Sequence, residues 1–321
     1  MLEFNIGAVS TANPDELYDL IIIGGGPAGL TAGLYAARYK RKTLMIEKKI
    51  VTGGQLTATE WVENYPGFPQ PVLGARLAAD MEAQAKLFGL QIVNDTVTEV
   101  ELEEKIKKVH TPYAVWRAKA VLIATGTSAR TLGVPGETEY YGKGVSYCAT
   151  CDGPFYPDKT LAVVGGGNSA FEESLFLAKY ASRIYLLHRS DQFRADKILI
   201  DRVVANSRIV LMPFYQVASI EFKESDAKHL LITDVRTNEV SRLTVDGLFI
   251  FIGNIPNTAV FEGKVEMDKG FVLADHTHQT SVNGVWAAGD VQVKALRQVA
   301  TAVGDGANAA YWIDKYLEEW D

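Results

Sequence analysis

Two cysteines separated by two residues, Cys148 and Cys151, are the side chains in this sequence best suited to redox chemistry. A pair of thiols at this spacing has three interpretations: half of a zinc site, a dithiol that cycles with a disulfide, or two unrelated buried cysteines. A zinc site needs two further ligands. The chain has no other cysteine, and of its five histidines only His276 and His278 lie close together in the sequence. We therefore predict no metal site.

The residues that follow the pair favour the redox interpretation. Asp152, Gly153 and Pro154 place the cysteines on a turn rather than within a core strand. Intracellular disulfides are more often catalytic than structural. A thiolate from such a pair attacks an external disulfide, and the thiol that leaves must be protonated. Asp152 is the candidate acid for that step, with a helix cap or a turn as its alternative role.

Two glycine-rich segments, GGGPAG at 24–29 and GGGNSA at 165–170, each follow a short apolar run and precede a stretch with helical spacing. One such motif is weak evidence, but this context in both copies is typical of a dinucleotide site. The first glycine makes the tight turn, the second lets the backbone approach a pyrophosphate, and the third lets helix and strand pack closely. The N-terminus of the helix then offers free N–H groups to the phosphates. We therefore expect two dinucleotide sites.

The two sites differ at the position where the ribose is expected. Glu47 ends the strand-like run after the first glycine turn, and a carboxylate there accepts hydrogen bonds from the ribose hydroxyls of FAD or NAD. The equivalent position after the second turn is His188, with Arg189, Ser190 and Arg194 beyond it. Basic donors there attract a 2′-phosphate and favour NADPH; a solvated charged turn is the alternative. We predict FAD at the first site and NADPH at the second.

The elements that must position these residues indicate an α/β fold with two Rossmann-like dinucleotide-binding domains and parallel sheets. A third apolar run at 284–288 leads into Gly289 and Asp290, and a helix is predicted from Arg297 to Glu319. The domain boundaries are predicted near Gly126 and Gly253, where a glycine follows an apolar strand. The other predicted strands are 19–23, 43–46, 120–124, 160–164, 183–187, 208–211, 230–232 and 247–251.

Composition excludes several classes of protein. The net charge of −7 argues against a nucleic-acid binder, which is normally basic. No apolar stretch approaches the ~20 residues that span a bilayer. The residues before the first predicted strand carry no lysine or arginine, so no secretory signal is expected. Two cysteines also exclude a disulfide-stapled scaffold. We expect a cytoplasmic enzyme.

The segment YCATCDG at 147–153, just before the second glycine turn, closely resembles the low-molecular-weight thioredoxin reductases. A glutathione-reductase-like protein would carry its cysteine pair in the FAD domain with a wider gap. The resemblance covers nearly the whole chain. It includes the segments GGQL at 53–56, ENYPG at 63–67, ATG at 124–126, GNIPNT at 253–258, GD at 289–290 and RQ at 297–298.

This resemblance implies a homodimeric enzyme that passes electrons from NADPH through FAD and a disulfide to thioredoxin. Its FAD domain would be discontinuous, about residues 1–126 and 253–321. The inserted domain, about 127–252, would bind NADPH and hold the disulfide. Cys151 would be the thiol that meets the flavin, and Cys148 the thiol that attacks thioredoxin.

The resemblance also implies which residues contact the cofactors. Those expected at FAD are Gly24, Gly26, Pro27, Ala28, Gly29, Glu47, Gly54, Gln55, Leu56, Asn64, Thr125, Gly126, Gly289, Asp290, Arg297 and Gln298. Those expected at the nicotinamide nucleotide are Gly165, Gly167, Asn168, Ser169, Ala170, His188, Arg189 and Arg194.

One position departs from the family pattern. NADPH-dependent members usually show two arginines after the histidine, and here Ser190 stands in place of the second. A hydrogen bond to a charged group contributes ~1.5–3 kcal/mol, so an uncompensated loss would weaken NADPH binding about 10- to 100-fold. Related flavoproteins that accept electrons from ferredoxin have lost this site. The retained glycine turn, Arg189 and Arg194 favour NADPH.

Three alternatives stay open on the sequence alone. Reduced ferredoxin could feed the same relay, docking on the basic stretches 40–42 or 105–108, although these are more often solvated faces. The relay could serve a dedicated peroxidase module. The protein could also be a non-catalytic flavin redox sensor, although the intact cysteine pair and Asp152 make that the weaker hypothesis. The aromatic tail, with Trp312, Tyr316 and Trp320, suits helix packing, a dimer contact or a lid over the flavin.

Overall fold

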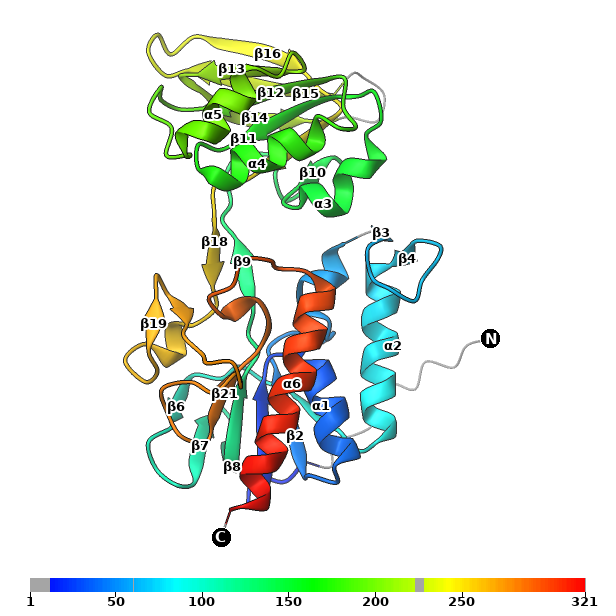
Figure 1. The fold of residues 1–321 in the computed structure, drawn as a ribbon, viewed down its shortest axis with the longest axis vertical. Coiled ribbons are helices and arrows are strands. Elements are labelled where there is room, and N and C mark those ends of the chain that lie inside the picture. The colour runs from blue at the N-terminus through cyan, green and yellow to red at the C-terminus, as the bar shows by residue number, and fades with distance from the viewer. Residues whose placement is uncertain (1–11, 60, 223–227, 321) are drawn as a thin grey trace. The chain divides into compact units, whose positions relative to one another are not determined.

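The structure is a computed structural model that describes residues 12–59, 61–222 and 228–320 (Figure 1). The described chain divides into two compact units. The first unit comprises the residues up to Ser128 together with those from Ile255 onward, and the second runs from Ala129 to Asn254. The predicted boundaries each fall two residues before these. No helix in the described part of the chain is long and apolar enough to cross a membrane.

The first unit is built on a seven-stranded sheet in the order β5-β2-β1-β8-β7-β6, with β21 paired to β8. The last four residues of the central strand β1 are apolar and buried, as expected for a parallel strand covered on both faces. The prediction of parallel sheets is wrong at one edge, where β7 and β6 continue antiparallel from β8. The short turn between β7 and β8 cannot span a parallel crossover. The strands are β1 (Leu17–Ile23), β2 (Thr43–Glu47), β5 (Gln91–Asn94), β6 (Glu99–Glu101), β7 (Lys107–His110), β8 (Val115–Ile123) and β21 (Val285–Ala287).

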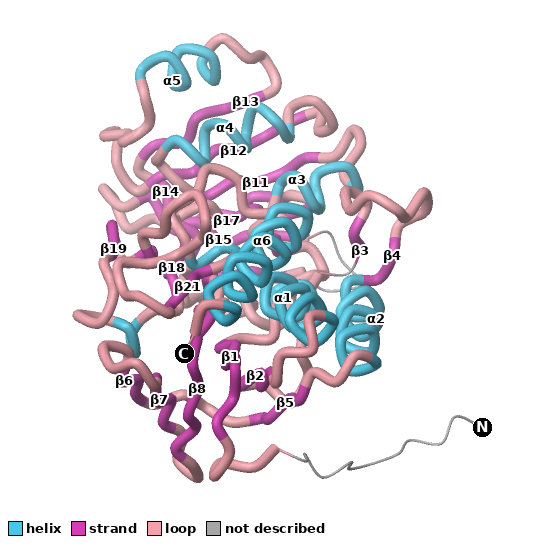
Figure 2. Tube along the Cα trace, turned by 60° about the horizontal axis from the view of Figure 1, so that its bottom comes forward, coloured by secondary structure: helices cyan, strands magenta, loops and turns pink. Residues whose placement is uncertain are grey.

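Three helices, α1 (Pro27–Arg38), α2 (Gly74–Leu87) and α6 (Val299–Glu318), lie together against one face of this sheet (Figures 1 and 2). Helices α1 and α6 pack closely, because a Cβ added at Gly306 would lie 2.2 Å from the carbonyl oxygen of Ala28. The core on the other face lies under the segment 261–291, and it includes Val100 of β6 and Val109 of β7. The aromatic tail of α6 contributes to the packing here, since Tyr316 meets the buried Trp286 edge to face at 5.2 Å.

The second unit holds a five-stranded parallel sheet in the order β10-β17-β11-β12-β13. Helices α3 (Ala149–Asp152), α4 (Asn168–Leu177) and α5 (Lys197–Val204) enclose the core on one face. A three-stranded antiparallel sheet, β14-β15-β16, covers the other face. The strands are β10 (Val145–Ser146), β11 (Thr160–Val164), β12 (Arg183–His188), β13 (Ile209–Pro213), β14 (Tyr215–Glu221), β15 (His229–Asp234), β16 (Val240–Thr244) and β17 (Gly247–Ile250).

Each unit therefore contains a β-strand, a glycine turn and a helix in the order predicted, and the α/β class with two Rossmann-like domains is confirmed. The short elements that complete the chain are η1 (Gly54–Ala58), β3 (Trp61–Val62), β4 (Val72–Leu73), β9 (Thr127–Ala129), η2 (Gly153–Phe155), β18 (Asn254–Pro256), η3 (Ala259–Phe261), β19 (Met267–Asp268), β20 (Phe271–Val272) and η4 (Gly289–Val291).

Candidate functional site

The first glycine turn joins β1 to α1, and its three glycines have three different surroundings. Gly24 has φ 109°, and a Cβ there would lie 2.4 Å from the carbonyl oxygen of Ala124. A Cβ at Gly29 would lie 2.0 Å from the carbonyl oxygen of Gly24. A Cβ at Gly26 would meet nothing within 4 Å. The outer glycines are therefore required by the protein's own packing, whereas the middle one leaves space in front of α1.

Glu47, at the end of β2, lies against this turn and is only 8% exposed. Its carboxylate accepts a hydrogen bond of 2.6 Å from the N–H of Gly25 and one of 2.8 Å from the N–H of Lys49. A carboxylate has about four acceptor positions, so these two bonds orient the group and leave capacity for the hydroxyls of a ribose.

Two buried oxygens next to this turn have no hydrogen-bond partner among the described residues. They are Oγ1 of Thr125, which follows β8, and Oδ1 of Asp290, which follows β21. Burial raises the pKa of the Asp290 carboxyl. Strands β1, β8 and β21 are adjacent and parallel, so all three lead to the same edge of the sheet. Unpartnered buried oxygens are rare, and these fit a ligand that brings hydroxyl or amide groups to this edge, as FAD does.

Arg297, in the segment before α6, contacts the loop that carries Asp290. Arg297 donates to the carbonyl oxygens of Asp290 at 3.2 Å and Gln292 at 3.1 Å. Its guanidinium lies 4.4 Å from the ring centre of Phe271, and burial lowers its pKa. Arg297 therefore holds the loop that carries Asp290 in place.

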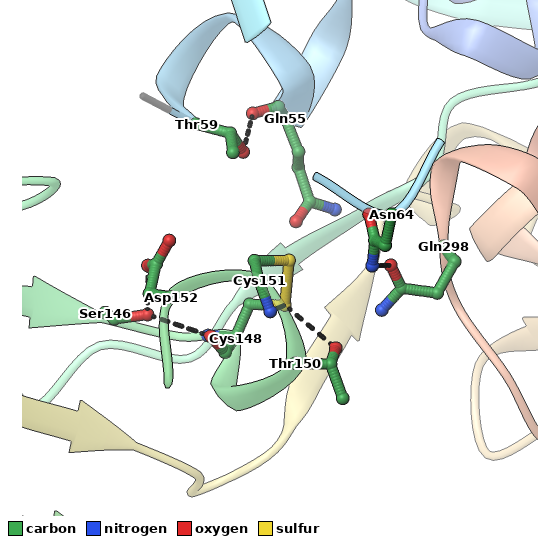
Figure 3. Close-up of a disulfide and its surroundings, with 9 residues drawn as sticks. All are labelled: Gln55, Thr59, Asn64, Ser146, Cys148, Thr150, Cys151, Asp152 and Gln298. Carbon is green, nitrogen blue, oxygen red and sulfur yellow. Dashed lines mark hydrogen bonds between the residues drawn. A yellow bond between two sulfur atoms is a disulfide. The ribbon is translucent and has the colours of Figure 1, made fainter. Parts of the chain in front are cut away.

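Three polar side chains from distant parts of the first unit also take defined positions. Asn64 donates to Oε1 of Gln298 at 3.0 Å (Figure 3). Gln298 also forms a capping box with Thr301, so α6 begins at Val299, two residues later than predicted. Gln55 donates through Nε2 to the carbonyl oxygen of Thr127 at 2.9 Å.

The remaining residues expected at FAD lie around the same turn. Gly54 and Leu56 are in η1, and a Cβ at Gly54 would lie 3.3 Å from the Cα of Gly26. Pro27 and Ala28 open α1, and a Cβ at Gly289 would lie 2.9 Å from the Cβ of Ala28. Gly126 follows Thr125 with φ 64°.

The second glycine turn joins β11 to α4 and repeats the geometry of the first. A Cβ at Gly165, where φ is 157°, would lie 2.4 Å from the carbonyl oxygen of Phe251. A Cβ at Gly167 would meet nothing within 4 Å. Ala170 takes the third position, and its methyl group would lie 2.6 Å from a Cβ at Gly165. The backbone of Gly167 is therefore open to a ligand at the start of α4.

The residues expected to select the nucleotide follow β12. The ring of His188 covers Gly166, where an added Cβ would lie 2.4 Å from it, and burial lowers the pKa of this histidine. The N–H of Arg194 donates to the carbonyl oxygen of Gly166 at 2.7 Å. Arg189 and Arg194 are exposed, and neither has an ion-pair partner in the part of the chain that the structure describes. Both cationic side chains are therefore available to a phosphate.

Three neutral side chains complete this second turn. Ser190 Oγ accepts from the N–H of Gln192 at 3.3 Å and donates to its carbonyl oxygen at 3.4 Å, so its hydroxyl is engaged within its own turn. Asn168 exchanges two hydrogen bonds with Asp196, at 2.9 and 2.8 Å. Ser169, at the start of α4, is exposed.

Cys148 and Cys151 form a disulfide in the second unit, with their Cα atoms 5.4 Å apart. The pair lies on a single turn of helix, α3, where a non-helical turn is predicted. Four residues are too few to show helical periodicity in the sequence. Cys148 caps this helix, and its Sγ accepts from the N–H of Cys151 at 3.2 Å. Thr150 Oγ1 lies 3.5 Å from the same sulfur (Figure 3). Both cysteines are half-buried, so the disulfide keeps contact with solvent.

Asp152 ends this helix, and its carboxylate is held by Ser146, a residue that the sequence pattern does not indicate. Ser146, the last residue of β10, donates through Oγ to Oδ2 of Asp152 at 2.5 Å. The same Oγ accepts from the N–H of Cys148 at 3.0 Å. The only sequence signal for Ser146 is a small polar residue two positions before a cysteine, which by itself indicates nothing.

A second polar network fixes the strand that leads into the cysteines. The buried carboxylate of Glu137 accepts from the hydroxyl of Tyr147 at 2.6 Å and from the N–H groups of Leu132 at 2.8 Å and Gly133 at 2.7 Å. Burial and the contact with Glu137 raise the pKa of Tyr147 far above its usual value. Tyr147 precedes Cys148, so this network anchors the backbone at the disulfide.

Comparison with known proteins gives a consistent result over most of the chain. Residues 18–306 match the family described as pyridine nucleotide-disulphide oxidoreductase. The thioredoxin reductase of Peptoclostridium acidaminophilum is 44% identical over 312 residues, covering 95% of this chain and 98% of that protein. The thioredoxin reductase of Bacillus subtilis is 42% identical over 306 residues, covering 95% and 96%. The crystal structure of thioredoxin reductase from Streptococcus pyogenes is 41% identical with a TM-score of 0.90, covering 94% of this chain and 99% of that one.

Proposed function

Since the chain belongs to the pyridine nucleotide-disulphide oxidoreductase family, we propose that it is a flavin-dependent enzyme that reduces the disulfide of thioredoxin with electrons from NADPH. It resembles proteins named thioredoxin reductase over nearly its full length. The observation that carries the proposal is the Cys148–Cys151 disulfide with Asp152 beside it.

The family implies FAD and NADPH as cofactors, and the residues present fit them. We propose that FAD lies over Gly26, with Glu47 accepting from the ribose and with Thr125 and Asp290 bonding to its polar groups. When bound, the flavin supplies two-electron transfer between a nicotinamide nucleotide and a disulfide. We propose that the nucleotide lies over Gly167, with its phosphates at the start of α4.

The chain's own dithiol then performs the exchange with thioredoxin. The thiolate of Cys148 attacks the substrate disulfide, forming a mixed disulfide and releasing one substrate sulfur. The thiolate of Cys151 attacks Cys148, which restores the internal disulfide and releases the second sulfur. Two electrons pass from the dithiol to the substrate, and the two thiol protons end on the product thiols. Asp152 holds the proton that Cys148 gives up, passes it to the first substrate sulfur that leaves, and then passes the Cys151 proton to the second.

The donor is the point at which this chain departs from its family pattern. Ser190 replaces an arginine, and its hydroxyl is engaged within its own turn. We propose that NADPH still binds through Arg189 and Arg194, with a weaker hold on the 2′-phosphate than two adjacent arginines would give. The alternative of a ferredoxin donor has no support from the family or from the relatives, which are named thioredoxin reductases. Because these relatives are named as enzymes, they also argue against a non-catalytic sensor.

Two further features are proposals that rest on the likeness to the family. We propose a homodimer that acts in the cytoplasm. Gel filtration with light scattering tests the first, and a monomer at micromolar concentration would contradict it.

The proposed donor is tested by an anaerobic titration of the purified flavoprotein with NADPH, followed by visible absorbance of the flavin. Bleaching at low stoichiometric excess is expected, and it would mean that Ser190 is a tolerated variation. No bleaching by NADPH, with full bleaching by dithionite or reduced ferredoxin, would contradict the proposal and would identify a protein as the donor.

A further inference from the structure

Ser146 contacts both the carboxyl of Asp152 and the backbone of Cys148. It is 3% exposed and ends β10, which pairs with β17 in the register Ser146 to Phe249. Its hydroxyl oxygen lies 2.5 Å from Oδ2 of Asp152 and 3.0 Å from the backbone nitrogen of Cys148 (Figure 3). The buried end of an edge strand therefore holds one oxygen that touches both the acid and the backbone of the cysteine pair.

The directions of these bonds follow from the chemistry of the groups. The Cys148 N–H can only donate, so Ser146 Oγ accepts from it. The serine has one hydrogen of its own, and two acceptors lie within reach: Oδ2 of Asp152 at 2.5 Å and the carbonyl oxygen of Cys148 at 3.3 Å. The shorter contact and the negative charge favour donation to an ionised Asp152. When Asp152 is protonated, the serine can turn its hydrogen to the Cys148 carbonyl and accept from the acid.

We propose that Ser146 is a positioning residue that holds the Asp152 carboxyl beside the cysteine pair and accommodates it in both protonation states. The inference rests on the proposed function, because it deepens the role given there to Asp152. Ser146 itself exchanges no proton with the substrate and touches neither sulfur. Its contribution is to keep the acid in one orientation while the carboxyl loses and regains its proton.

Asp152 transfers one proton in each of the two exchange steps. As the thiolate of Cys148 forms its bond to one substrate sulfur, the substrate S–S bond breaks and its electron pair leaves on the other sulfur. Asp152 gives its proton to that sulfur and becomes a carboxylate, to which Ser146 then donates its hydrogen bond. The carboxylate recovers a proton from the Cys151 thiol. The resulting thiolate attacks Cys148, the mixed disulfide breaks, and the second substrate sulfur leaves and receives that proton from Asp152.

A comparison of two disulfide probes separates positioning from a general structural role. Protein reduced with dithionite is mixed with oxidised thioredoxin or with dithiodipyridine, an aromatic disulfide whose leaving group is stable without a proton. The rate of a single oxidation of the dithiol is measured for wild type, Ser146→Ala, Ser146→Thr, Asp152→Asn and the double variant Ser146→Ala with Asp152→Asn. Ser182→Ala is the matched control, because its hydroxyl donates only to the backbone carbonyls of Asp158 and Lys159.

We expect Ser146→Ala to slow oxidation by thioredoxin about 10-fold and to leave the rate with dithiodipyridine within about twofold. Ser146→Thr, which keeps the hydroxyl, should recover most of the thioredoxin rate. The double variant should react at the rate of Asp152→Asn alone, because Ser146 acts only through that carboxyl. Ser182→Ala should match wild type with both probes.

Other outcomes overturn the inference. A Ser146→Ala rate equal to wild type, equal losses with both probes, or a double variant slower than Asp152→Asn would each exclude positioning through Asp152. If Asp152→Asn is slow and Ser146→Ala is not, this inference alone fails and the proposed function stands. If Asp152→Asn matches wild type, the acid is misassigned. If reduced wild-type protein does not react with thioredoxin, the proposed function fails as well.

Discussion

Replacing Gly26 by alanine should weaken FAD binding without harming the protein fold. The backbone at Gly26 has φ −74° and ψ −179°, which any residue adopts, and an added Cβ meets no protein atom within 4 Å. A glycine-to-alanine change at such a position stabilises a protein by about 0.4–1 kcal/mol through the unfolded chain. The flavin-free variant should therefore be at least as stable as flavin-free wild type.

The same change should lower the affinity for FAD. If the pyrophosphate of FAD lies over Gly26, a methyl group enters the space that the ligand needs. Overpacking of this size costs about 1–3 kcal/mol, which corresponds to a loss of roughly 5- to 150-fold in affinity. Fluorescence titration of the deflavinated proteins with FAD measures this loss, and urea unfolding without FAD measures the stability.

Two other glycines provide matched controls. Gly167→Ala places a methyl group in the equivalent open position of the second unit, so it should weaken nucleotide binding and leave FAD affinity unchanged. Gly29→Ala places a Cβ 2.0 Å from the carbonyl oxygen of Gly24, so it should destabilise the protein even without a ligand. Wild-type FAD affinity in Gly26→Ala would refute the placement of the flavin. A flavin-free Gly26→Ala protein that unfolds like Gly29→Ala would refute the claim that this position is open.

Three further changes give separate predictions. Asp290→Asn should stabilise the flavin-free protein at pH 7 and weaken FAD binding. Burial raises the pKa of Asp290, so the wild type loses stability as pH rises from about 4 through that raised pKa. Equal urea midpoints for the two proteins at pH 7 would contradict this. Ser190→Arg should tighten NADPH binding about 10-fold or more and leave NADH unchanged, and equal gains for both nucleotides would rule out a contact with the 2′-phosphate. Tyr147→Phe should cost about 1.5–3 kcal/mol of unfolding free energy, because Glu137 loses a buried donor, and a loss below about 0.5 kcal/mol would show that the bond contributes little.

The parts of the site encoded locally are the parts that the sequence predicts. The strand, the glycine turn and the following helix are consecutive, so the turn at Gly24 and its repeat at Gly165 follow from spacing alone. Glu47 lies beside the first turn because β1 and β2 are neighbouring parallel strands. The disulfide forms between residues three apart.

The contacts that the sequence does not predict depend on distant segments. Asn64 and Gln298 are 234 residues apart and meet only after α6 has packed in the first unit. Ser146 is close to Asp152 in sequence, but its burial requires β10 to pair with β17, about one hundred residues later. The antiparallel edge formed by β7 and β6 also escaped prediction, because short strands carry too few residues to show their direction.

The most direct test of the central claim, that electrons reach thioredoxin through the Cys148–Cys151 disulfide, compares wild type with Cys148→Ser. Flavin bleaching by NADPH and NADPH-dependent reduction of thioredoxin are measured on the same preparations. The variant should still bleach with NADPH, because this step does not need Cys148, and it should not reduce thioredoxin. Thioredoxin reduction by Cys148→Ser at the wild-type rate would contradict the dithiol relay.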